Sequence, residues 1–174
     1  QGVLKEGEVL TAENLLYVML IESSNRAAFA LSQFTGNEKF IQLMNKKAKE
    51  LGLESTNFID AAGLDENSHS SARDIYIISR HLFENYPLFS QIISQKTYNL
   101  YLTDGRLHHK LENTNKLLGQ FPNIVGGKTG FTLTAKGCLM MIKNNPLKGT
   151  YTINIILGAN DREKQMIKLI NLIK

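Results

Sequence analysis

Residues 124–132 read Ile-Val-Gly-Gly-Lys-Thr-Gly-Phe-Thr, and this stretch predicts a strand at the exposed edge of a sheet. Its glycines, Gly126, Gly127 and Gly130, allow another backbone or a ligand to approach closely. An edge strand of this kind can pair with an extended peptide through main-chain hydrogen bonds, while Lys128 attracts a carboxylate. We therefore expect the strand to bind a peptide.

The chain after this strand predicts an antiparallel sheet backed by one helix. Strand-like segments occupy residues 137–143 and 151–159, and the turn-forming run Asn144–Gly149 separates them. Asp161 is placed to cap a final helix. Residues 119–174 are therefore expected to form a part made of antiparallel strands and a C-terminal helix.

Residues 1–118 have mainly helical patterns, with a small hairpin indicated near residues 96–111 by Asp104-Gly105. Thr11 is a suitable N-cap for the first helix. The apolar face of that helix would consist of Leu15, Leu16, Met19 and Leu20. Ser23-Ser24-Asn25 interrupts the helix, because such side chains compete for backbone hydrogen bonds. A helical part followed by antiparallel strands predicts an α+β fold.

The composition excludes several classes of protein. The net charge of +4 is scattered along the chain, so nucleic-acid binding is not implied. A single cysteine rules out an internal disulfide, and no apolar run approaches the length of a membrane span. His108 and His109 lie near Glu112, but the sequence lacks the spacings typical of metal sites, so no metal is expected.

Four blocks of sequence, taken in order, resemble one enzyme family. The blocks are Leu15–Ala28 with its Ser-Ser-Asn, Ser70–Asp74, Glu112–Leu118 and Gly127–Thr132. Their order and spacing resemble the serine-type D-alanyl-D-alanine carboxypeptidases, which are low-molecular-mass penicillin-binding proteins. Enzymes of this kind combine a Ser-x-Asn motif with a Lys-Thr-Gly motif.

The resemblance implies a penicillin-recognising, serine β-lactamase-like fold: an antiparallel sheet with flanking helices and an all-α subdomain, with the active site in the cleft between them. The implied activity is removal of the terminal D-Ala from peptidoglycan stem peptides through an acyl-enzyme, without a metal or organic cofactor. Peptidoglycan pentapeptide and β-lactams are the implied ligands. The implied location is extracytoplasmic, in the periplasm or at the cell surface.

The resemblance assigns catalytic roles to Ser23, Asn25 and Lys128. Ser23 would relay a proton to the leaving amine, as general acid–base catalysis requires. Asn25 would orient the lysine base and the substrate amide through hydrogen bonds. Lys128 would supply positive potential for the terminal carboxylate of the substrate and hold the proton network of Ser23.

Four further residues are implied substrate contacts. Thr129 would hydrogen-bond the substrate carboxylate, and Gly130 would keep the strand flat. The backbone N–H near Phe131 is a candidate half of an oxyanion hole. Arg162 matches a family position near the substrate carboxylate, and a surface charge at the start of a helix is the equal alternative for it.

The sequence departs from the family pattern in three places. No serine is followed by a lysine three residues later, so the Ser-x-x-Lys motif that carries the nucleophile is absent from the sequence. Arg26 follows Ser-x-Asn where the family often has Asp. Phe131 follows Lys-Thr-Gly where some members have His.

Three interpretations of the missing motif are open. The sequence is a fragment of a longer enzyme, or a non-catalytic homologue that binds wall peptides or acts in assembly, or a chain that complements another one carrying the serine. A fragment without the family's N-terminal strands would leave an exposed sheet edge that can pair with the missing segment. Without a nucleophile, the isolated chain is expected to be inactive.

Overall fold

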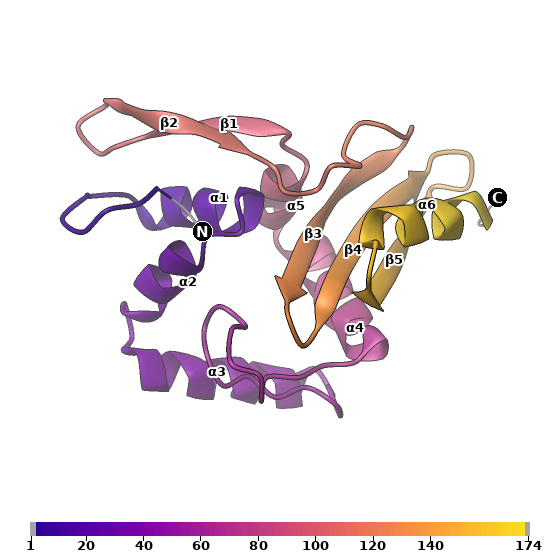
Figure 1. Ribbon diagram of the computed structural model, residues 1–174, viewed down its shortest axis with the longest axis horizontal. Coiled ribbons are helices and arrows are strands. Elements are labelled where there is room, and N and C mark those ends of the chain that lie inside the picture. The colour runs from indigo at the N-terminus through magenta and orange to yellow at the C-terminus, as the bar shows by residue number, and fades with distance from the viewer. Residues whose placement is uncertain (1–2, 173–174) are drawn as a thin grey trace. The chain divides into compact units, whose positions relative to one another are not determined.

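The computed structural model describes residues 3–172, which form two compact units (Figure 1). The helical unit consists of the chain up to Ser70 together with Thr97–Asn113. The sheet unit consists of Ser71–Lys96 together with the chain from Thr114 onwards. The sequence analysis expected a boundary between residues 118 and 119. The two units have other boundaries, because two helices that precede residue 118 pack on the sheet. Helices combined with antiparallel strands confirm the expected α+β class.

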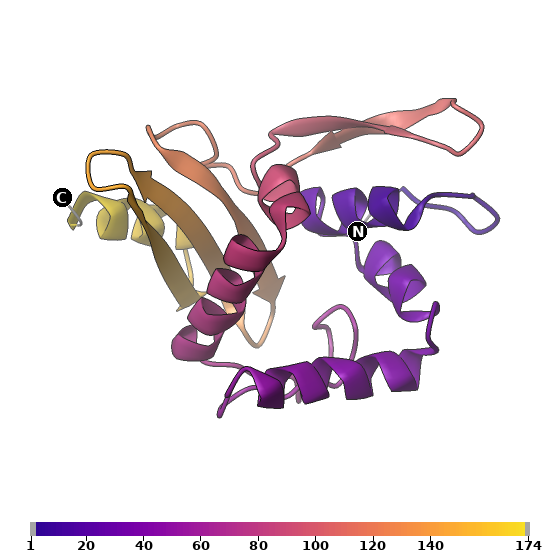
Figure 2. The ribbon, with the colours of Figure 1, turned by 180° about the vertical axis from the view of Figure 1, so that it is seen from behind.

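The helical unit combines three helices with a hairpin that comes later in the sequence. Its elements are α1 (Ala12–Ile21), α2 (Asn25–Ser32), α3 (Asn37–Glu50), β1 (Thr97–Tyr101) and β2 (Leu107–Glu112). The hairpin expected near residues 96–111 is present, with β1 and β2 antiparallel. It lies beside α1, which contacts both strands (Figures 1 and 2).

Helix α1 begins as predicted but buries a different face. The Thr11 hydroxyl caps it by accepting a hydrogen bond from the Asn14 N–H at 3.0 Å. The buried residues are Leu15, Tyr17, Val18 and Ile21, whereas Leu16, Met19 and Leu20 are half-buried. The prediction is confirmed at Leu15 and wrong for the other three residues. The buried face includes Tyr17 instead, because its ring stacks on Tyr98 of β1 with centroids 4.0 Å apart.

The sheet unit has helices on both faces of an antiparallel sheet. Its elements are α4 (Ala72–Asn85), α5 (Pro87–Ile93), β3 (Ile124–Thr132), β4 (Lys136–Asn145), β5 (Thr150–Ala159) and α6 (Arg162–Leu172). The strand order is β3-β4-β5, so β3 is an edge strand of this sheet, as predicted. Asp161 caps α6 as expected, since its Oδ1 accepts a hydrogen bond from the Lys164 N–H at 2.8 Å.

Alternation along β4 divides the core of this unit into two layers. Leu139 and Met141 pack with Met166 and Ile170 of α6. Met140 and Ile142 point to the opposite face and pack with Ile93 of α5. Figure 1 shows α6 in front of the sheet, and Figure 2 shows α4 and α5 in front of its other face. Among residues 3–172, no helix is both long and apolar enough to span a membrane.

Two of the three glycines of β3 are needed by the chain's own backbone. A Cβ at Gly126 would lie 2.6 Å from the Ile93 carbonyl oxygen, and one at Gly127 would lie 2.3 Å from the Met140 carbonyl oxygen. A Cβ at Gly130 would meet only the Cys138 Cβ, at 3.5 Å, which is an ordinary contact. The first two glycines therefore bring α5 and β4 close to β3, whereas Gly130 leaves that side of the strand open.

Gly126→Ala is expected to destabilise the protein by about 3 kcal/mol, because the methyl group pushes α5 away from β3. Gly130→Ala is the matched control on the same strand and should change the free energy of unfolding by less than about 1 kcal/mol. Urea denaturation of both variants measures the difference. Equal losses of stability in the two variants would contradict this account of the glycines.

Candidate functional site

Ser23-Ser24-Asn25 forms the junction between α1 and α2 in the helical unit. Ser24 is buried and caps α2, because its hydroxyl accepts a hydrogen bond from the Ala27 N–H at 3.3 Å. Asn25 is half-buried and is the first residue of α2. Ser23 is half-buried and has a φ of +59°, which lies in the left-handed region that residues other than glycine rarely adopt.

The left-handed conformation of Ser23 is held by the turn around it. The N–H groups of Glu22 and Ser24 both donate to the Val18 carbonyl oxygen, at 3.2 and 3.4 Å. Val18 is fully buried, so this anchor lies in the core of the unit. Strained backbone of this kind costs about 1–3 kcal/mol and clusters at functional sites, where the surrounding structure enforces it. Ser23 is the residue of this turn that has the strained backbone.

Lys128 occupies the middle of β3, opposite Met140 of β4. Its side chain is half-buried, and the Nζ atom donates a hydrogen bond to the Thr129 carbonyl oxygen at 2.7 Å. Burial lowers the pKa of Lys128 to about 8, and the positive charge of Arg162 contributes to the same shift. The ammonium is therefore incompletely solvated, which increases its attraction for an anion.

The Thr129 side chain is only 6% exposed, and its hydroxyl oxygen lies 2.6 Å from that of Thr114. One hydroxyl donates to the other. If Thr114 donates, the hydrogen of Thr129 remains available for a second acceptor. Sequence reasoning did not single out Thr114, although it lies within the block Glu112–Leu118. The neighbouring Asn115 stabilises the local turn, since its Oδ1 accepts a hydrogen bond from the Leu117 N–H at 3.1 Å.

Arg162, the first residue of α6, reaches across to β3. Its Nη1 donates to the Gly130 carbonyl oxygen at 2.8 Å, and its Nε donates to Glu163 at 3.0 Å. The side chain is 19% exposed, so it is not a freely solvated surface charge. Phe131, next along the strand, is 67% exposed. Lys128, Thr129, Gly130, Phe131 and Arg162 are thus part of one cluster on β3 and α6.

The predicted site residues fall into two groups, one in each unit of the structure. Ser23 and Asn25 lie at the helix junction of the helical unit, and the other five lie on the β3–α6 cluster of the sheet unit. Their catalytic and binding roles stay predictions. Among residues 3–172, no three or more His, Cys, Asp or Glu side chains are grouped so as to hold a metal ion.

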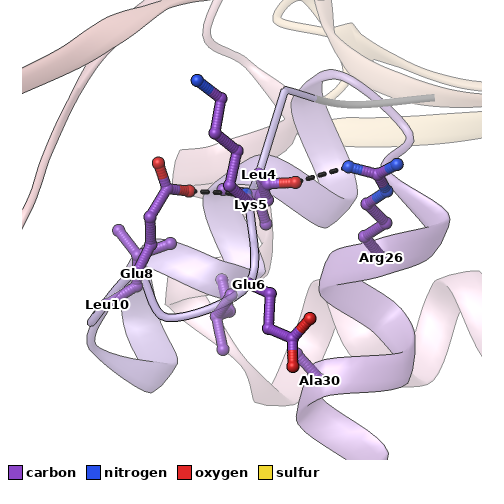
Figure 3. A pocket seen from close by; sticks show the side chains of 8 residues that line it. Leu4, Lys5, Glu6, Glu8, Leu10, Arg26 and Ala30 are labelled. Atoms are coloured by element: carbon purple, nitrogen blue, oxygen red, sulfur yellow. Dashed lines mark hydrogen bonds between the residues drawn. The ribbon is translucent and has the colours of Figure 1, made fainter.

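Arg26, which departs from the family pattern, is engaged with the segment before α1. Its Nη1 donates to the Leu4 carbonyl oxygen at 2.5 Å (Figure 3). It borders a hollow of about 500 Å³ in the helical unit. The lining residues are Leu4, Lys5, Glu6, Glu8, Leu10, Leu15, Arg26 and Ala30. The guanidinium of Arg26 therefore binds the segment before α1, although Arg26 directly follows Asn25 in the sequence.

An α+β fold that carries Ser-x-Asn at a helix junction and Lys-Thr-Gly on an edge strand defines the penicillin-recognising class of active-site serine enzymes. The model of the D-alanyl-D-alanine carboxypeptidase family matches residues 1–161, and the chain belongs to this family. Both the resemblance and the fold expected from the sequence are therefore confirmed.

Solved structures of the same class superpose on nearly the whole chain. A mutant of the Streptomyces K15 DD-transpeptidase is 29% identical with a TM-score of 0.90, over 98% of this chain and 70% of its own. Penicillin-binding protein D2 from Listeria monocytogenes, in its cefotaxime-bound form, is 30% identical with a TM-score of 0.83. This match covers 99% of this chain and 74% of that one.

Curated relatives are longer than this sequence. D-alanyl-D-alanine carboxypeptidase DacF of Bacillus subtilis is 36% identical over 181 residues, which cover 98% of this chain and 44% of DacF. The D-alanyl-D-alanine endopeptidase of Escherichia coli is 34% identical over 147 residues, covering 79% of this chain and 46% of that protein. The chain thus spans less than half the length of these relatives.

Proposed function

We propose that this chain is part of a serine D-Ala-D-Ala carboxypeptidase, which removes the terminal D-Ala of peptidoglycan stem peptides through an acyl-enzyme and is acylated by penicillins. Membership of the carboxypeptidase family supports the reaction class. The observation that carries the proposal is the half-buried ammonium of Lys128 on an edge strand, a binding element for a peptide that ends in a carboxylate. Because this substrate lies in the cell wall, the proposed location is extracytoplasmic.

The β3–α6 cluster would recognise the C-terminal carboxylate of the stem peptide. Lys128 supplies an ammonium that is only partly hydrated, so the carboxylate replaces little water when it binds. The Thr129 hydroxyl can donate to the same carboxylate when Thr114 donates to it. Arg162 keeps the Gly130 carbonyl occupied, which fixes the strand beside which the peptide would lie.

The junction residues would serve proton transfer in the same reaction. A nucleophilic serine attacks the carbonyl of the penultimate D-Ala, the ester forms, and the peptide nitrogen leaves as the amine of D-Ala after taking a proton. Ser23 would relay that proton, and its strained backbone is typical of a residue held for function. Asn25 would hydrogen-bond the lysine base and the substrate amide.

The nucleophile in this proposal comes from a Ser-x-x-Lys motif outside the 174 residues, because no serine among them has that spacing. The chain covers 44% of DacF, so this relative is longer than the 174 residues. Pairing of the chain with a segment that carries the nucleophile is part of the proposal. The isolated chain would then bind ligands without being acylated. The alternative is a non-catalytic module that binds wall peptides or acts in assembly.

Labelling with a fluorescent penicillin tests the proposal. The whole protein, expressed with the reading frame upstream of Gln1, should become covalently labelled, and ampicillin should compete for the label. The 174-residue chain alone should remain unlabelled and should release no D-Ala from a diacetyl-Lys-D-Ala-D-Ala peptide. If the whole protein binds that peptide reversibly but is never acylated, the non-catalytic alternative is correct.

A further inference from the structure

Two consecutive histidines on β2 point to the same side of the hairpin because the strand contains a bulge. Leu100 pairs with His109, but Tyr101 pairs with Leu107, so His108 is an additional residue in the strand. A bulge interrupts the alternation of side chains along a strand. The two imidazoles therefore meet, with ring centroids 4.7 Å apart and the two Nδ1 atoms in contact at 2.5 Å.

Each imidazole also contacts a carboxylate from another segment. His108 Nε2 lies 3.0 Å from Glu8 Oε1 in the segment before α1, and His109 Nε2 lies 3.2 Å from Glu22 Oε1 at the end of α1. The histidine side chains are 10% and 21% exposed. Glu8 is itself fixed by the Lys5 N–H, which donates to its other oxygen at 2.7 Å (Figure 3).

We propose that Glu8, His108, His109 and Glu22 form a hydrogen-bonded clasp that positions Ser23, and this role rests on the function proposed for Ser23 above. Glu22 immediately precedes Ser23, so its contact with His109 ties the strained turn to the hairpin. The second carboxylate ties the hairpin to the segment before α1. Ser23 is thereby held from outside the two helices that it joins.

Few other charges face the clasp. The backbone hydrogen bond from Lys5 lowers the pKa of the Glu8 carboxyl, and the charge of Lys5 adds to the same shift. The remaining titratable groups on the segments packed around β2 are Glu6, Glu13, Tyr17, Tyr98, Tyr101, Asp104, Arg106, Lys110 and Glu112. No hydrogen bond or ion pair described for residues 3–172 joins any of these groups to the two imidazoles.

NMR spectra of the histidine side chains and backbone amides of this chain test the clasp directly. His108 contacts His109, and His109 contacts Glu22, which precedes Ser23. His108→Gln should therefore shift the His109 imidazole signal and the Ser23 backbone amide signal together. His81→Gln, on α4, is the matched control and should leave both signals unchanged.

Two results would overturn the clasp: a His109 imidazole signal that is unchanged in His108→Gln, or a Ser23 amide signal that is unchanged in the same variant. Penicillin acylation of the whole protein gives the functional arm, in which His109→Gln should lower the rate about tenfold by misplacing Ser23. If acylation occurs but this variant and Glu22→Gln acylate at the unaltered rate at every pH, the positioning role is wrong. If the NMR result holds but the whole protein is never acylated, the proposed function fails and the clasp stands.

Discussion

Lys128→Ala is expected to lower the rate of penicillin acylation of the whole protein by about 10²–10³-fold. The lysine would supply the positive potential for the substrate carboxylate, and its ammonium is more effective than a solvated one because it is half-buried on β3. Stopped-flow or quenched labelling with a fluorescent penicillin measures the acylation rate constant at pH 7.

Lys168→Ala is the control for this prediction, because Lys168 is an exposed lysine of α6 in the same unit. Its acylation rate should equal that of the unaltered protein. A rate in Lys128→Ala within threefold of the unaltered protein would remove the lysine from the mechanism. Circular dichroism of both variants checks that the fold is retained.

Lys128→Met is expected to stabilise the protein by about 2 kcal/mol at pH 7, at the cost of activity. Burial lowers the pKa of Lys128 from 10.5 to about 8, so the folded state holds the charged form less well than the unfolded state does. The stabilisation is partly offset by loss of the hydrogen bond to the Thr129 carbonyl oxygen. Urea denaturation at a series of pH values measures the effect.

The pH dependence has a defined sign. Below pH 8 the lysine is charged in both states, and the destabilisation that methionine removes is at its full value. Between pH 8 and 10.5 the folded state loses its proton first, so the unaltered protein gains stability as pH rises and the advantage of Lys128→Met declines. An advantage that stays constant across this range would show that charge burial is not its cause.

Local patterns in the sequence were sufficient for much of the fold. The edge strand, the hairpin and the caps at Thr11 and Asp161 follow from alternation, turn residues and hydrogen-bonding side chains that lie within a few positions of one another. The buried face of α1 did not follow, because Tyr17 stacks on a residue more than eighty positions away. Contacts of that separation leave no periodicity in the sequence.

The same limit applies to the candidate site. The motifs around Ser23 and Lys128 are contiguous, so their resemblance to a family was recognisable. The contact of Thr114 with Thr129 and the reach of Arg162 to the Gly130 carbonyl depend on how separate segments fold together. The bulge at His108 is likewise invisible in the sequence, because it is a feature of strand register.

The left-handed backbone of Ser23 bears on how its chemistry can be examined. An alanine at this position would delete the hydroxyl and keep the steric penalty of a Cβ in that conformation. Glycine adopts the same φ without that penalty, so Ser23→Gly removes the hydroxyl oxygen without straining the backbone of the turn. A comparison of the two substitutions would separate the chemical role of the Ser23 hydroxyl from the conformational requirement of the turn.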